Sequence, residues 1–340
     1  MRLSCLHIIS LLLPVAVALS ACHPIEEFPA DNSGNFEALW TAVDEHYCFF
    51  AEKDVDWNRI RNQYAPLITA DLSKQQLFGV CADMINELCD GHTNLSSSFQ
   101  TSYYRKWWSD YPQNYDARLI EENYLNFEYS QLGNVTYGIL PQNIGYIAIP
   151  SFNSGLGNGN IDWILSSMAS ANALIIDLRD NGGGSMSYAE TWVRHFIRQP
   201  LTAGYIQHKT GPAHDAFDSP RPITFEPLSA DNIVWIKPVA ILTNRSTFSA
   251  ANYMTMCMRS IPGVIHVGAT TGGGAGMPIT LELPNGWSIR MSAVRVYDSQ
   301  MHITEHGIEP TAGCAVDLDP AQALQGHDSI LDLAITKLSK

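Results

Sequence analysis

Basic residues are scarce in this chain of 340 residues, which has 20 Lys and Arg against 34 Asp and Glu and a formal net charge of -14. No long basic run occurs, and such a stripe is what proteins use to hold a phosphate backbone. The sequence therefore predicts no nucleic-acid partner. Charged residues make up only 16% and hydrophobic residues 46%, which is typical of a globular protein with a sizeable core.

Cysteine is also sparse, and its spacing excludes two kinds of site. The chain has seven cysteines and no CxxC pair, so we expect neither a zinc site nor a redox dithiol. We expect no metal and no cofactor. Most of the cysteines beyond the N-terminal segment lie in apolar stretches, which predicts small buried side chains: Cys48, Cys81, Cys89, Cys257 and Cys314.

The first 21 residues resemble the signal peptide of a bacterial lipoprotein. Arg2 gives a short positive region, residues 6–19 are apolar but short for a membrane span, and LSAC at 19–22 resembles a lipobox. Cleavage would leave Cys22 as a lipidated N-terminus that anchors the protein to the membrane, followed by a polar tether over residues 22–35. This predicts the bacterial cell envelope, and the outer membrane in particular. An ordinary secretory signal is the alternative.

Residues 36–92 have helical periodicity and predict an N-terminal helical domain. Apolar residues recur at helical spacing over 35–47, over 55–64 and from Ser73 to the DGH turn, with Trp57 facing inward. The next segment, 93–134, is aromatic and shows no clear period. We expect it to form a cap on the substrate side.

From Val135 onward, short apolar runs alternate with helical stretches, which predicts a layered α/β core over residues 135–340. Strands are expected at YGIL, IGYIAIPSF, ALIIDL, NIVWI, VAILT and VIHVGA, and a hairpin at ITLELPNGWSIRMSAVRV. Helices are expected over 161–171, 188–198, 250–260 and 329–338.

Two loops that follow predicted strands carry candidate chemistry. VAILTNRSTFSAAN (239–252) places Ser249 at a strand-to-helix junction, where a nucleophile is often mounted, although a serine there also serves as an N-cap. DLRDNGGG (177–184) can aim glycine N–H groups at an oxyanion or a phosphate, although such a turn also allows tight packing. GxGxxG, a P-loop lysine and GxSxG are all absent, which excludes three common nucleotide-binding and hydrolase motifs.

A third motif, DGHT at 90–93, supplies His92. A histidine in a polar turn is commonly only solvated. The joint occurrence of the three motifs nevertheless predicts a serine hydrolase whose site is divided across the chain.

In combination, STFSAAN, DLRDNGGG, DGHT and the closing GIEP resemble the C-terminal processing and tricorn-type serine peptidases. The resemblance covers most of the mature chain and implies a ClpP/crotonase-like spiral of ββα units that cleaves peptide or protein substrates through an acyl-enzyme. Matching SAAN to the SASE of that family implies Ser249, not Ser246, as the nucleophile. It also implies the amide of Ala250 in the oxyanion hole, with Gly183 or Gly184 as the second donor.

The same resemblance implies the base. Processing peptidases use a lysine some way beyond the serine, but TTGGGAGMP at 270–278 contains none, which excludes the lysine dyad. Tricorn-type members use a histidine, which implies His92. They add a glutamate late in the chain, and HITEHGIEP offers Glu305 as an orienting group, although strict spacing favours Thr304. The family's serine before the histidine is replaced by Gly91, and Thr93 is a candidate substitute.

Only about forty residues separate DGHT from YGIL, too few for a complete PDZ domain, so recognition of a C-terminal tail in the usual manner is not expected. The sequence predicts a lipid-anchored serine endopeptidase and indicates no oligomeric state. Two other functions stay open. One is a catalytically inactive ligand- or peptide-binding module, similar to the retinoid-binding relatives of the family. The other is a crotonase-like acyl-CoA enzyme, which leaves Ser249 and His92 without roles.

Overall fold

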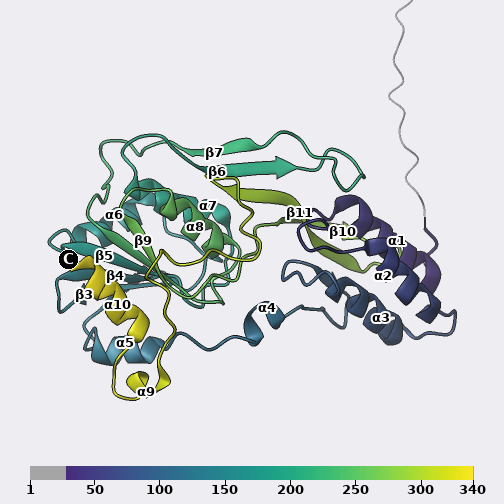
Figure 1. Ribbon diagram of the computed structural model, residues 1–340, viewed down its shortest axis with the longest axis horizontal. Coiled ribbons are helices and arrows are strands. Elements are labelled where there is room, and N and C mark those ends of the chain that lie inside the picture. The colour runs from purple at the N-terminus through teal and green to yellow at the C-terminus, as the bar shows by residue number, and fades with distance from the viewer. Residues whose placement is uncertain (1–27, 340) are drawn as a thin grey trace, which may run out of the picture.

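Two β-sheets organise the computed structural model, which describes residues 28–339 (Figure 1). The predicted signal peptide (1–21), Cys22 and the first part of the tether lie outside the described residues. Within 28–339, no helix is long and apolar enough to cross a membrane.

The larger sheet has six strands in the order β2-β3-β4-β5-β8-β9. Its first three strands pair antiparallel, and β4, β5, β8 and β9 run parallel. The strands β5 and β8 are buried along their whole length, as expected for parallel strands with helices on both faces. The bounds are β2 (Ser130–Leu132), β3 (Val135–Leu140), β4 (Ile144–Ala148), β5 (Ala173–Asp177), β8 (Val239–Thr243) and β9 (Val264–Gly268).

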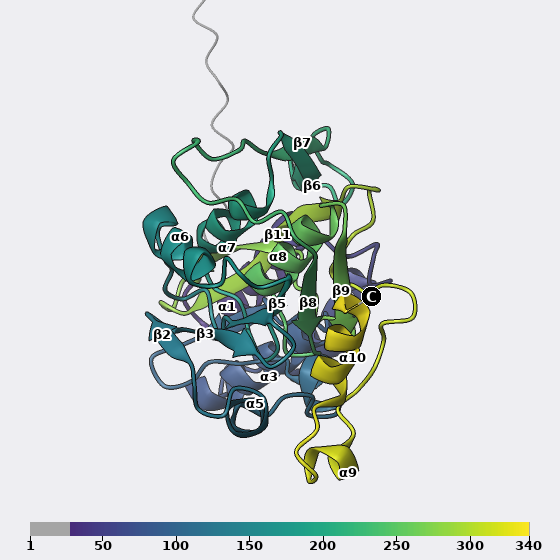
Figure 2. The same cartoon turned by 90° about the vertical axis from the view of Figure 1, so that its left-hand side faces the viewer.

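Helices cover both faces of this sheet (Figures 1 and 2). One face packs against α6 (Asn158–Ser167), α7 (Met186–Val193) and α8 (Ala250–Arg259). The opposite face packs against α5 (Ala117–Asn123) and α10 (Ser329–Leu338), with the short α9 (Pro320–Ala323) before α10. Each apolar core is therefore a layer between the sheet and one set of helices.

The N-terminal helices are α1 (Asn32–His46), α2 (Trp57–Tyr64) and α3 (Lys74–Asn86). The helix α3 begins at a capping box, because the Ser73 hydroxyl accepts from the Gln76 amide while the Gln76 side chain accepts from the Ser73 amide. Trp57 is buried as predicted. The three helices share a separate apolar core with the hairpin of β10 (Met277–Glu282) and β11 (Ser288–Asp298).

The second sheet connects these helices to the rest of the molecule. Its strand order is β1-β11-β6-β7, and β10 also pairs with β11. All pairings in this sheet are antiparallel. The long strand β11 runs from the N-terminal helices to β6 (Leu201–His208), which pairs with β7 (Arg221–Phe225) (Figure 1). At its other end it pairs with β1 (Asn94–Ser96). This strand therefore fixes the segment after DGHT relative to the larger sheet.

The predicted mixed α/β architecture is confirmed, and one predicted strand is wrong. NIVWI (232–236) is not a strand, because its amides bond to helical segments: Ile233 N–H donates to Asp162 Oδ1, and Trp235 N–H donates to the carbonyl of His195. The strands β6 and β7 were not predicted. The segment 93–134 is also less irregular than predicted, because it contains β1, α4 (Lys106–Ser109), α5 and β2.

Four of the five cysteines within 28–339 are buried, as predicted. The prediction is wrong for Cys89, which is exposed and has a φ of 49° in the turn that leaves α3. All five are free thiols.

Candidate active site

The loops that follow β5 and β8 meet at one edge of the larger sheet, because these strands are parallel neighbours. DLRDNGGG leaves β5, and the loop to Ser249 leaves β8. The Thr247 hydroxyl donates to the carbonyl of Leu178 at 2.8 Å, and the Phe248 amide donates to the carbonyl of Asn181 at 3.0 Å. The two sequence motifs therefore form one bonded unit.

Ser249 has an unusual backbone conformation directly before α8. Its φ of 56° and ψ of -119° lie outside the regions that non-glycine residues ordinarily adopt. Its amide donates to the carbonyl of Gly273 at 2.9 Å, which helps hold this conformation. Ser249 is the N-cap residue of α8, but its side chain makes no capping hydrogen bond and meets His92 instead. Strain of this type costs about 1–3 kcal/mol and is concentrated at functional sites.

His92 reaches this serine from a segment 157 residues earlier in the chain. It lies in the turn between α3 and β1, and the pairing of β1 with β11 positions that turn. The distance from His92 Nε2 to Ser249 Oγ is 2.9 Å, within hydrogen-bond range. The backbone amide of His92 donates to Asp90 Oδ1 at 2.7 Å. The turn thus holds the imidazole at the serine.

One aromatic ring packs beside the imidazole, and a second packs on the first. Phe248 lies 4.7 Å from the His92 ring between centroids, and Trp107 stacks on Phe248 at 4.1 Å. A Cβ at Gly91 would lie 2.6 Å from Trp107 Nε1. The indole therefore occupies the space that a serine at position 91 would need, which explains the departure from the family motif.

Burial keeps His92 neutral. The imidazole is almost fully enclosed, and this desolvation lowers its pKa to about 4 although the carboxylate of Asp90 opposes the effect. The positive charges of Arg290 and Lys53 lower the pKa further. At neutral pH the ring is therefore unprotonated and can accept a proton at Nε2.

A buried charge cluster lies behind the histidine and consists of Lys53, Asp90 and Glu305. Lys53 Nζ lies 3.0 Å from Glu305 Oε1 and donates to the carbonyl of Cys89 at 3.0 Å. Burial alone would raise the pKa of Asp90, but Lys53 and His92 reverse this and hold it below its usual value. Burial and the charge of Asp90 raise the pKa of Glu305 to about 7, although Lys53 opposes them. The cluster therefore holds one firmly ionised carboxylate and one that titrates near neutral pH.

Glu305 does not contact the imidazole directly. Its Oε2 accepts from the Ala275 amide at 2.9 Å, and its Oε1 pairs with Lys53. Within residues 28–339, His92 Nδ1 has no hydrogen-bond partner. The expected orienting contact from Glu305 to the ring is thus absent from the structure. Thr304, the alternative at this position, accepts from Asn252 Nδ2 and belongs to another network.

The candidate oxyanion donors differ in their availability. The Gly183 amide donates to Asn181 Oδ1 at 2.9 Å and is therefore already used. The amides of Gly184 and Ala250 make no hydrogen bond in the described part of the chain, and Ala250 opens α8, where N–H groups lack helical partners. Gly183 still has a steric role, because a Cβ there would lie 2.7 Å from Ser249 Cβ.

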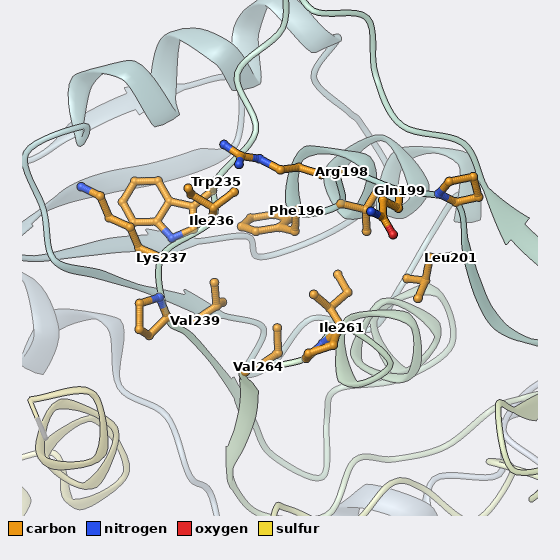
Figure 3. Close-up of a pocket in the computed structure, with 15 residues that line it drawn as sticks. Phe196, Arg198, Gln199, Leu201, Trp235, Ile236, Lys237, Val239, Ile261 and Val264 are labelled. Atoms are coloured by element: carbon orange, nitrogen blue, oxygen red, sulfur yellow. The ribbon is translucent and has the colours of Figure 1, made fainter.

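One cavity borders Ser249, and a second borders the loop that precedes it. The first, of about 340 Å³, is lined by Ser249, Gly184 and Arg290 among others. The other, about 390 Å³, is lined by aromatic side chains of the segment 93–134 and by Ser246. A larger cavity of about 520 Å³ lies elsewhere, around Phe196, Trp235 and Ile261 (Figure 3). Of these three cavities only the one of about 340 Å³ contains candidate catalytic residues, so the chemistry points to that cavity.

Sequence reasoning missed Lys53, Arg290 and Trp107. Lys53 lies in an ordinary polar turn after α1, and Arg290 is one residue of a regular strand, so neither has a local signal. Trp107 had a partial signal in the aromatic YYRKWW stretch. Within the described residues, no cluster of His, Cys, Asp and Glu has the arrangement of a metal site.

The chain is similar to known peptidases in both sequence and fold. Residues 143–313 match the model of peptidase family S41, and residues 28–86 match the tricorn protease C1 domain. A crystal structure from Parabacteroides merdae ATCC 43184, of a protein named as a candidate peptidase, is 41% identical with a TM-score of 0.86. The alignment covers 91% of this chain and 97% of the Parabacteroides merdae chain.

Two curated proteins are also similar over about half of this chain. The carboxy-terminal processing protease CtpA of Bacillus subtilis (strain 168) is 28% identical over 171 residues, 49% of this chain and 34% of its own length. The chloroplastic carboxyl-terminal-processing peptidase 2 of Arabidopsis thaliana is 25% identical over 170 residues, 49% of this chain and 31% of its own. The matched region thus spans about a third of each curated relative.

Proposed function

Because the chain belongs to peptidase family S41, we propose that it is a serine endopeptidase with Ser249 as nucleophile and His92 as base. The observation that carries this proposal is the 2.9 Å separation of His92 Nε2 from Ser249 Oγ. It is supported by the strained φ of Ser249 and by the neutral state of the buried imidazole. Peptides or proteins are the substrates that the family implies.

The geometry supports an acyl-enzyme reaction. His92 Nε2 takes the proton of the Ser249 hydroxyl as Oγ attacks the peptide carbonyl carbon, and the amides of Ala250 and Gly184 donate to the resulting oxyanion. The imidazolium then gives its proton to the departing amine, which leaves an ester on Ser249. Water, deprotonated by the same imidazole, hydrolyses this ester and restores the serine. In this scheme Lys53 acts on His92 through its charge, and Glu305 acts by holding Lys53 in place.

A fluorophosphonate probe tests the nucleophile. We expect the probe to label the intact protein on Ser249, because only an activated serine attacks its phosphorus at an appreciable rate. Mass spectrometry of a digest can distinguish Ser249 from Ser246 in the same loop. Labelling of another serine would reject this assignment. Absence of labelling in folded protein would instead favour the inactive binding module.

The pH profile of kcat/KM tests the base. His92 accepts a proton only when neutral, so activity should persist above its pKa of about 4 and decline as the pH falls through that value. An exposed histidine would instead give a limb near 6.5. Circular dichroism at each pH separates this limb from acid unfolding. In the Glu305→Gln variant, any inflection of the profile near pH 7 should vanish, while the decline at acid pH should remain. A decline centred near pH 6.5 in the unaltered protein would contradict a buried neutral base.

The location of the protein and its spiral topology stay predictions. The lipobox-like LSAC supports lipidation at Cys22 and attachment to a bacterial envelope membrane, the outer membrane in particular. The mass of the mature N-terminal peptide tests this, because an unmodified Cys22 would exclude the lipid anchor. The family supports the ClpP/crotonase-like spiral of ββα units.

A further inference from the structure

The cavity of about 340 Å³ beside Ser249 has one charged side chain among the described residues that line it, that of Arg290. Its other walls include the apolar side chains of Met186, Met277 and Val296. A substrate side chain next to the cleaved bond would thus meet apolar side chains, uncharged polar ones such as Asn252 and Thr304, and a single guanidinium. No acidic residue of the described chain lines this cavity to neutralise that charge.

Arg290 is held in place without a carboxylate partner. It lies in β11 opposite Asn94 of β1 and Thr280 of β10, so strands flank it on both sides. Its side chain is half-buried, and one guanidinium nitrogen, Nη1, donates to the carbonyl of His92 at 3.2 Å. Among residues 28–339, no carboxylate lies within ion-pair distance of it.

Burial makes a guanidinium without an ion-pair partner unfavourable at this position. Desolvation lowers the pKa of Arg290, and only the charge of Asp90 opposes the effect, without an ion pair. A carboxylate that enters the cavity could restore the missing interaction through two parallel hydrogen bonds, the geometry that guanidinium groups favour. An amide of the same shape lacks the charge for this.

We propose that Arg290 selects a carboxylate of the substrate beside the bond that is cleaved. This inference rests on the proposed peptidase function. The carboxylate can belong to a glutamate or aspartate side chain or to the C-terminus of the peptide. A glutamate fits both features of the cavity, because its methylene stem can pack on Met186 and Met277 while its head meets the guanidinium.

The test uses three heptapeptides of alanine that carry an uncharged dansyl label and have one variable central residue. The first has a central Glu and an amidated C-terminus, the second a central Gln and an amidated C-terminus, and the third a central Gln and a free carboxylate. We expect kcat/KM, measured by chromatography of products, to be about 10- to 100-fold higher for one or both carboxylate peptides than for the uncharged one. The first peptide reports an acidic side chain and the third reports the C-terminus.

Arg290→Gln should reduce this preference to within about twofold, whatever its effect on absolute rates. The ratio is the informative quantity, because Arg290 also contacts the backbone of His92 and a disturbed base would slow all three peptides equally. Arg118→Gln is the matched control, since Arg118 is exposed on α5 and pairs with Glu122 far from the cavity. It should keep the preference of the unaltered protein.

A binding measurement separates failure of this inference from failure of the proposed function. Fluorescence anisotropy of the same peptides with Ser249→Ala should show the same order of affinities and the same loss in the Ser249→Ala, Arg290→Gln double variant. If no peptide is cleaved and no serine is labelled, the peptidase function fails, but the anisotropy still reports on Arg290. Equal rates and affinities for all three peptides overturn the role of Arg290, as does a preference that survives Arg290→Gln.

Discussion

Ser249→Ala is expected to lower kcat/KM for peptide hydrolysis by about 10⁴-fold or more, because the acyl-enzyme cannot form without the hydroxyl. The fold should be retained, since the hydroxyl that is removed is half-buried and hydrogen-bonds to His92, and its loss leaves the apolar packing intact. The measurement is steady-state turnover of a peptide substrate, with the thermal midpoint recorded in parallel.

Ser246→Ala is the matched control, because Ser246 lies three residues earlier in the same loop, and we expect it to keep most of the activity. The variant His92→Ala should be nearly as inactive as Ser249→Ala. The kcat/KM of the double variant should equal that of the less active single variant, because the two residues act as one unit. Additive losses would show that His92 and Ser249 act independently. Turnover within tenfold of normal in Ser249→Ala would exclude this serine as the nucleophile.

Arg179→Leu is expected to destabilise the protein by about 3–5 kcal/mol, because it leaves buried carboxylates without their cation. Arg179 lies in the DLRDNGGG loop and is fully buried. It pairs with Asp177 Oδ2 at 2.6 Å and with Asp328 Oδ2 at 2.8 Å. Asp328 in turn caps α10 by accepting from the amides of Ile330 and Leu331. Denaturant unfolding measures the loss, and a reduced midpoint with an unchanged slope is the expected form.

The control for this prediction is Arg118→Leu, which removes the exposed pair of Arg118 with Glu122 on α5. Such surface pairs contribute about 0.2–1 kcal/mol to stability, so the denaturant midpoint of Arg118→Leu should barely change. A similarly small change for Arg179→Leu would show that water reaches the two carboxylates and that the buried ion pairs do not hold the loop. In that case the loop would depend on its bonds to Phe248 and Thr247 instead.

Local chemistry explains which elements could be predicted from the sequence. The helix α3 begins after Ser73 because a capping box requires residues only three positions apart. The strands β5 and β8 are apolar along their length because helices cover both faces. NIVWI has the same composition, but its amides bond to Asp162 and His195, so composition alone could not distinguish it from a strand.

Some residues of the candidate site could likewise be predicted from local sequence, and others could not. Ser249 and the glycine loop were predictable because each follows a buried strand within a few residues. The contact of Glu305 with Lys53 was not predictable, because 252 positions separate them and the tertiary fold brings them together. The availability of Gly184, rather than Gly183, depends on where the Asn181 side chain points.

Short motifs around rigid strand ends were enough to predict the family, the mixed α/β class and the candidate residues Ser249 and His92. Three features are visible only in the folded chain: His92 lies 2.9 Å from Ser249, its ring is buried and neutral, and Arg290 lines the adjacent cavity without an ion-pair partner among the described residues. The physical reason is that pKa values and pairings depend on groups from distant segments. Here β11 joins β1 and β6 across the molecule and brings those segments into contact.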